Sequence, residues 1–105
     1  MSQAQRLQRV SERFTAITAA AEDDERHAIM GTALSQTKAA CEEAAAHEQS
    51  GDVKQRLTDV ASALQTWQDV WPRLGTQPEF RLAVSREARL WSKRFADAAK
   101  AAPSL

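Results

Sequence analysis

Apolar residues near the start of the chain recur at alternating steps of three and four, which is the spacing of one helix face. The residues of this first stripe are Leu7, Val10, Phe14, Ile17 and Ala21. β-Branched residues are few and never alternate with polar residues over a useful length, so no segment predicts a strand. The chain is therefore expected to be all-α, with a first helix over residues 3–21.

A longer and more regular stripe occupies the third quarter of the chain. It consists of Val53, Leu57, Val60, Leu64, Trp67, Val70 or Trp71, and Leu74. Asp52 follows a serine–glycine turn and is expected to cap this helix, with Gln55 completing a capping box. Pro72 lacks a backbone N–H and disfavours helical backbone at the preceding residue. The predicted helix therefore covers residues 52–71, with Gly75 as its C-cap.

The last quarter of the chain opens with a helix start, because Thr76 offers a capping hydroxyl and Pro78 fits the first helical turn. A final helix is predicted over residues 77–101. Its apolar face consists of Phe80, Val84, Ala88, Trp91 and Phe95. All three tryptophans share stripes with aliphatic residues, so most of their surface is expected in the core. Trp71, at the corner between two helices, is the one expected to be partly exposed.

The segment from residue 19 to residue 36 has two interpretations. Acidic residues from Glu22 to Glu25 suit the first turn of a helix, where the helix dipole is positive. The next apolar stripe, which begins at Met30, points roughly 160° away from the first one. Either the chain reverses here and a second helix covers residues 24–49, or residues 3–49 form one long helix in a three-helix arrangement. We favour the reversal, which gives a small antiparallel bundle of four helices.

The length of 105 residues suits a single helical domain, residues 1–105, with one modest core. A content of 43% hydrophobic and 27% charged residues is typical of a folded globular chain. No run approaches the roughly 20 apolar residues that span a bilayer, and the N-terminus lacks the pattern of a signal peptide. Cys41 is the only cysteine, so no internal disulfide can form. We expect a soluble cytoplasmic protein that does not act on a membrane.

Few residues are candidates for catalysis or metal binding. His27, Cys41 and His47 are the possible ligands, with Glu43 four residues before His47. A zinc site takes three or four ligands, and no CxxC or HxxxH pair accompanies these residues. We interpret the histidines as solvated and Cys41 as a small buried hydrophobe. Without a phosphate loop or a nucleophile elbow, we expect no enzyme activity, metal, cofactor or small-molecule substrate.

Charge is balanced overall but uneven along the chain, with an acidic stretch between Glu22 and Glu48 and a basic one between Glu79 and Lys100. On the last helix four cations project within roughly 60° of one another, opposite the aromatic face. This C-terminal ridge consists of Arg86, Arg89, Lys93 and Lys100. A similar N-terminal ridge on the first helix consists of Arg6, Arg9 and Arg13. First and last helices are neighbours in an up-down bundle, so the ridges are expected to form one surface.

Leu82 projects into the C-terminal ridge and Leu90 lies at its edge. Leucines beside arginines are typical of protein interfaces, because apolar anchors and arginine are common there. We therefore expect a non-enzymatic helical protein–protein interaction or assembly module. Its predicted interaction surface consists of Arg86, Arg89, Lys93, Leu82 and Leu90. Contact between this surface and the acidic end of a second copy, at Glu42, Glu43 and Glu48, would make the protein a homo-oligomer.

Two other interpretations of the cations remain. The protein is alternatively a nucleic-acid-binding accessory subunit whose basic side chains contact phosphates. The residues that would bind are Arg6, Arg9, Arg13, Arg86, Arg89, Lys93 and Lys100. The ridges can also be ordinary solvated helix faces that keep the bundle in solution.

Overall fold

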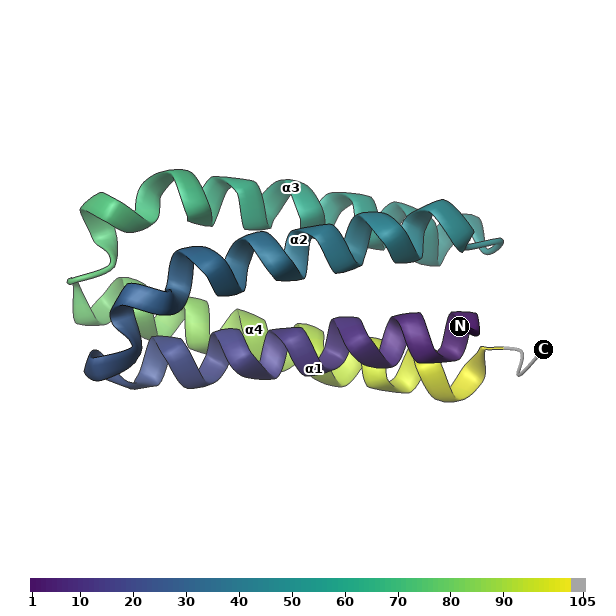
Figure 1. Cartoon of the computed structure of the whole chain (residues 1–105), viewed down its shortest axis with the longest axis horizontal. Coiled ribbons are helices and arrows are strands. Elements are labelled where there is room, and N and C mark those ends of the chain that lie inside the picture. The colour runs from purple at the N-terminus through teal and green to yellow at the C-terminus, as the bar shows by residue number, and fades with distance from the viewer. Residues whose placement is uncertain (103–105) are drawn as a thin grey trace.

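The computed structural model describes residues 1–102, apart from the side chains of Asp24, Arg26 and His27. Its elements are α1 (Gln3–Glu22), the 3₁₀ segment η1 (Asp24–Ile29), α2 (Met30–His47), α3 (Gly51–Leu74) and α4 (Pro78–Ala101). Successive α-helices run in opposite directions along a bundle whose backbone measures 43 × 19 × 19 Å (Figure 1). The predicted all-α antiparallel bundle of four helices is confirmed.

The chain reverses between α1 and α2, so the alternative of one long helix over residues 3–49 is wrong. Asp23 leaves the helical conformation, and its side chain accepts a hydrogen bond from the Glu25 backbone N–H at 2.9 Å. A short aspartate side chain competes in this way with helical hydrogen bonding and favours a turn. The second helix begins at Met30 rather than at residue 24, because residues 24–29 form the 3₁₀ segment.

The ends of α3 differ from the prediction at both termini. Ser50 rather than Asp52 is its N-cap, and the Ser50 hydroxyl accepts from the Val53 N–H at 3.5 Å. The helix also continues through Pro72 to Leu74 instead of ending at Trp71. A proline in the last turn removes only one helical hydrogen bond, and the following turn is held because Gly75 N–H donates to the Trp71 carbonyl at 2.8 Å.

The start of α4 lacks the expected hydroxyl cap. Its N-cap is Gln77, which makes no side-chain capping bond, so Thr76 does not cap the helix. Pro78 occupies the first turn as expected, and the Arg81 N–H donates to the Gln77 carbonyl at 3.1 Å. The fixed backbone of proline and this bond are therefore what begin α4.

The predicted apolar stripes of all four helices meet in one core. Its fully buried large side chains are Leu7, Val10, Phe14, Ile17, Met30, Leu34, Thr37, Cys41, Leu57, Leu64, Val84 and Phe95. The rings of Phe14 and Phe95 stack across α1 and α4 with centroids 6.0 Å apart. The expectation that Trp71 is partly exposed is wrong, because only 6% of its surface is accessible and its ring lies 6.0 Å from that of Phe80.

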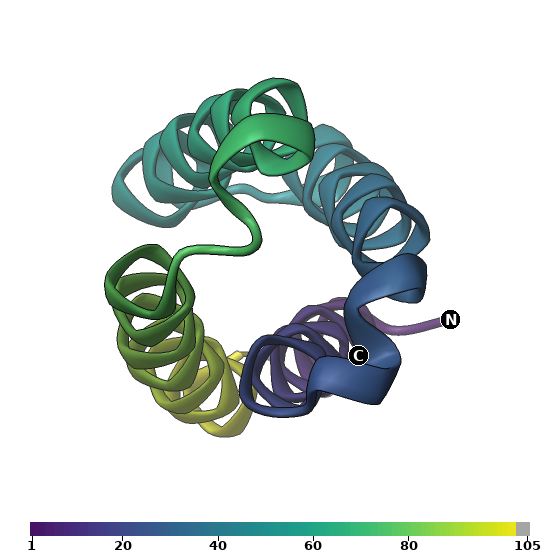
Figure 2. The ribbon, with the colours of Figure 1, turned by 90° about the vertical axis from the view of Figure 1, so that its left-hand side faces the viewer.

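The bundle consists of two closely packed helix pairs, α1 with α4 and α2 with α3, whereas α3 and α4 make the fewest contacts of any neighbouring helices. Viewed along the bundle axis, the ribbons of α3 and α4 lie apart from each other (Figure 2). Small residues let α1 and α4 approach: the Ser11 hydroxyl donates to the Ser92 carbonyl at 2.7 Å, and Ala88 is fully buried. Interaxial distance follows the size of the side chains at the contact. Between α3 and α4, by contrast, a ring contact is made by two large side chains, Trp71 and Phe80.

The stacked rings at the α1–α4 contact give a test of the core. We expect Phe95→Ala to lower the free energy of unfolding by about 3–5 kcal/mol, because it leaves a cavity against Phe14. The exposed Leu82→Ala is the control and should change it by less than about 0.5 kcal/mol. Urea denaturation followed by circular dichroism measures both values, and equal effects would contradict the assignment of this core.

Candidate interaction surfaces

The N-terminal and C-terminal ridges lie on different flanks of α1. The flank toward α4 carries polar residues: Thr15 contacts Ser92 at 3.0 Å, and Glu22 pairs with Arg89. The flank toward α2 carries the arginines, and Arg13 Nη1 donates to Gln36 of α2 at 3.1 Å. At 100° per residue, the row of α1 between the two flanks contains the exposed Glu12. The two ridges therefore do not merge into one basic surface, although their helices are neighbours.

The C-terminal ridge is also partly neutralised. Arg89 forms its ion pair with Glu22, which accepts a second hydrogen bond from the Ser85 hydroxyl at 2.7 Å. Lys93 pairs with Asp97, one helical turn away, at 3.1 Å. Exposed pairs of this kind contribute little to stability, but each lowers the charge that the ridge presents to a polyanion.

The remaining cations of the two ridges are spread apart. Arg86 and Lys100 are exposed on α4, and Arg9 is exposed on the outer side of α1. Arg6 is half-buried beside α2, where its Nη1 donates to Gln3 at 3.4 Å. Cations that face different directions cannot follow one phosphate backbone together.

Leu82 and Leu90 are both exposed, by 51% and 42%, but they lie on different sides of α4. Leu82 lines a shallow hollow with Glu22 and Ser85, next to the end of α1. At 100° per residue, Leu90 points away from that side, toward the one that faces α3. The predicted surface therefore divides, with Leu82 and Arg89 toward α1 and Leu90 toward α3.

The side of the bundle where α3 and α4 meet is apolar and incompletely covered. We call this the α3–α4 side, and its half-buried residues are Trp67, Val70 and Leu74 of α3 and Phe80, Trp91 and Ala98 of α4. Trp91 stacks on the buried Phe95 with centroids 5.9 Å apart, and the Arg94 guanidinium lies 5.0 Å from the Trp91 ring centre. The aromatic surface is thus continuous with the core and carries an arginine at its edge. The apolar spacing predicts most of the surface of these rings in the core, but it does not show how few contacts α3 and α4 make.

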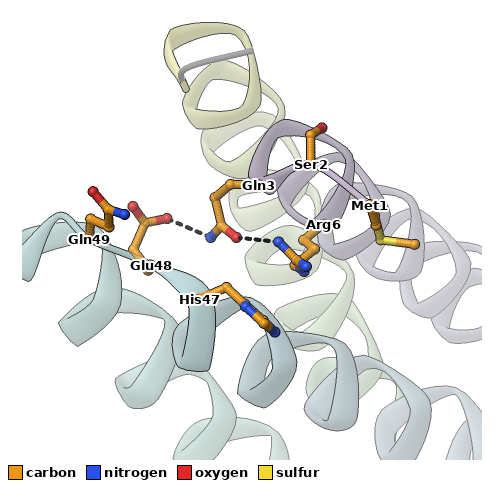
Figure 3. Close-up of a pocket in the computed structure, with 7 residues that line it drawn as sticks. All are labelled: Met1, Ser2, Gln3, Arg6, His47, Glu48 and Gln49. Atoms are coloured by element: carbon orange, nitrogen blue, oxygen red, sulfur yellow. Dashed lines mark hydrogen bonds between the residues drawn. The ribbon is translucent and has the colours of Figure 1, made fainter. Parts of the chain in front are cut away.

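A cleft of about 270 Å³ lies at the other end of the bundle, between the start of α1 and the end of α2. Gln3 spans it: its amide donates to Glu48 at 2.8 Å and to the Ala44 carbonyl at 3.0 Å, and its oxygen accepts from Arg6 (Figure 3). His47 lies beside Arg6 on the floor of the cleft (Figure 3). Arg6 of α1 and Glu48 at the end of α2 both hydrogen-bond to Gln3, so this network connects α1 to α2.

The structure does not gather the candidate metal ligands. Among the described residues, no three histidine, cysteine, aspartate or glutamate side chains lie close enough to hold a metal ion. His27 falls outside the described side chains, His47 and Glu43 are exposed, and Cys41 is fully buried. Burial raises the pKa of the Cys41 thiol from 9.0 to about 12, and the nearby Glu42 carboxylate adds to this effect.

Comparison with known proteins gives no relative for this chain: no family model, no curated protein and no solved structure matches it. Within residues 1–102, no helix combines the length and apolar character needed to cross a membrane. Any function must therefore be argued from the surfaces described above.

The raised pKa of Cys41 predicts its reactivity. At pH 8 we expect the thiol of the native protein to resist a disulfide reagent, because it is buried and protonated, and to react at once in denaturant. Since the folded pKa lies above the ordinary 9.0, the free energy of unfolding should fall as the pH rises from 9 toward 12. A thiol that reacts rapidly in the native state would contradict this burial.

The divided ridges predict weak interaction with nucleic acid. We expect no change in the fluorescence anisotropy of short labelled DNA or RNA on addition of the protein, even at about 50 mM salt. Binding that falls steeply toward about 200 mM salt, and that Arg86→Ala or Arg13→Ala weakens equally for all sequences, would establish the nucleic-acid alternative instead.

Proposed function

We propose that the protein is a non-enzymatic helical interaction module that binds a protein partner, itself or another chain, through the α3–α4 side. The observation that carries this proposal is the half-buried row of Trp67, Phe80 and Trp91 along the two helices that pack least closely. Aromatic side chains with one face on a rigid core are the anchors that dominate binding energy in protein interfaces.

The surroundings of Trp91 support a protein partner. Arg94 lies over the ring, and the exposed Leu90 precedes Trp91 in the chain, so a leucine, an aromatic ring and an arginine lie within five residues of one helix. Tryptophan and arginine are enriched at interface centres, where partner atoms exclude water from them. Because Trp91 also stacks on Phe95, its ring is held in place before a partner arrives. Little side-chain freedom would be lost on binding.

The α3–α4 side is better suited to binding a protein than the N-terminal and C-terminal ridges are to binding a nucleic acid. The α3–α4 side is apolar, whereas Arg89 and Lys93 of the C-terminal ridge already pair with carboxylates. Of the surface predicted from sequence, Leu90 is the residue that borders the α3–α4 side, with Arg86 one turn before it. Cys41, buried and unpaired, suits a reducing compartment, and we propose that the module works in the cytoplasm.

Photo-crosslinking from Leu90 tests the proposal. A photoreactive amino acid in place of Leu90 should give covalent adducts with a protein in the native cells, because this position borders the aromatic row. The same amino acid in place of Leu82 is the control, since that side chain is equally exposed on the α1 side of α4. Adducts identified by mass spectrometry at position 90 but not at position 82 are expected. Equal yields at both positions, or none at position 90, would contradict the proposal.

A further inference from the structure

The side of α4 that faces α3 carries a second stripe, distinct from the core stripe. Ser85, Arg89 and Ser92 mark the opposite side, because their bonds reach α1. The residues of the second stripe are Phe80, Ala83, Glu87, Leu90, Trp91, Arg94, Ala98 and Ala101. Each of them is half-buried or exposed. They recur at steps of three or four about the adjacent pair Leu90 and Trp91, which is the spacing that packs one helix against another.

The residues of this stripe are complementary to those of a second, antiparallel copy of the same stripe. When two copies of α4 lie antiparallel with a two-fold axis between Leu90 and Trp91, positions equally far from the axis face each other. Glu87 of each copy then faces Arg94 of the other. Ala83 faces Ala98, two small residues, and Phe80 faces the small Ala101. Each pair is complementary in charge or size, and each occurs twice because the two-fold axis repeats it.

The two charged residues of the stripe are free to make this contact. Within the part of the chain that the structure describes, Glu87 forms no ion pair, and Arg94 contacts only the ring of Trp91. By contrast, Arg89, Lys93 and Asp97 of the same helix already have partners of opposite charge. Among the described residues, Glu87 and Arg94 thus lie without partners of opposite charge on the same side of α4 as the half-buried rings of Phe80 and Trp91.

We propose that the occupant of the α3–α4 side is a second copy of this chain, in a two-fold dimer whose α4 helices pack antiparallel. The inference rests on the proposed interaction function and names its partner. Such a dimer is closed, since the same side of each copy is used. Contact between the C-terminal ridge and the acidic end would instead join two different surfaces of the bundle. That acidic end is also engaged already, because Glu48 accepts from Gln3 and Glu42 pairs with Lys38 at 3.4 Å.

Charge reversal at the two ends of the proposed ion pair tests the dimer. Light scattering and sedimentation measure the mass of the full chain, and we expect the wild type to dimerise. Glu87→Arg and Arg94→Glu should each raise the dimer Kd at least about tenfold, because symmetry turns each reversal into two like-charge contacts. An equimolar mixture of the two variants should form heterodimers, in which both ion pairs are restored. The double variant E87R/R94E should dimerise like the wild type.

Two matched control variants distinguish the loss of the Glu87–Arg94 ion pair from a general effect of changing the protein's net charge. Arg86→Glu reverses an exposed arginine on the outward face of α4, and Glu12→Arg reverses an exposed glutamate on α1. Neither position belongs to the stripe, so both variants should dimerise like the wild type. Circular dichroism establishes that every variant keeps the helical content of the parent.

Three results of the mass measurements would overturn the inference, and two results of the crosslinking would as well. One is a wild type that stays monomeric at the highest concentration it tolerates. Another is a dimer that Glu87→Arg and Arg94→Glu leave unchanged, as in a parallel pairing, where each reversal exchanges one like-charge contact for another. The third is a dimer that Arg86→Glu breaks instead. In the crosslinking experiment, adducts from position 90 to a different protein would overturn the dimer but support the interaction module. The absence of any adduct from position 90 would overturn both the dimer and the interaction module.

Discussion

The close contact between α1 and α4 is the constraint on which the rest of the bundle depends. Serine and alanine side chains let the two helices approach, and the stacked rings of Phe14 and Phe95 fill the interior beneath them. On the opposite side of the core, α2 and α3 form the second close pair, and the small residues Ala45 and Ala61 lie where these two helices meet. The two pairs meet at α1 with α2 and at α3 with α4, and the second of these contacts is much the smaller. There the rings of Trp71 on α3 and Phe80 on α4 lie with their centroids 6.0 Å apart.

The loose packing of α3 against α4 leaves part of an apolar surface exposed to solvent, and the proposed function depends on that surface. Trp67, Phe80 and Trp91 lie at the edge of the core, on the two helices that pack least closely against each other. Here each of them keeps one part in the core and presents another part to solvent. The preorganised rings can therefore bind without losing much side-chain entropy. The same side of α4 carries Glu87, Leu90 and Arg94 beside the rings, and in the proposed dimer these residues would select the partner.

The apolar spacing was enough to predict the helices and the stripes that form the core, although it left open whether residues 3–49 form two helices or one. The reversal near Asp23 could also be predicted, because acidic residues are unfavourable at the end of a helix. Spacing along one helix does not reveal how closely each neighbour approaches, so neither the opening between α3 and α4 nor the burial of Trp71 followed from it. The two basic ridges were placed on neighbouring helices correctly, but the rotation of α1 about its own axis turned them apart. A row of small residues, Ser11 on α1 with Ser85 and Ser92 on α4, was the signal that could have fixed that rotation.

The most direct test of the central claim is to locate intermolecular contacts by nuclear magnetic resonance, in an equimolar mixture of isotope-labelled and unlabelled wild-type protein. Filtered spectra report only contacts between different copies. The open α3–α4 side predicts contacts from the Leu90 methyl groups of one copy to the Trp91 ring of the other. Intermolecular contacts at Leu82 on the α1 side of α4, with none at Leu90 or Trp91, would contradict it.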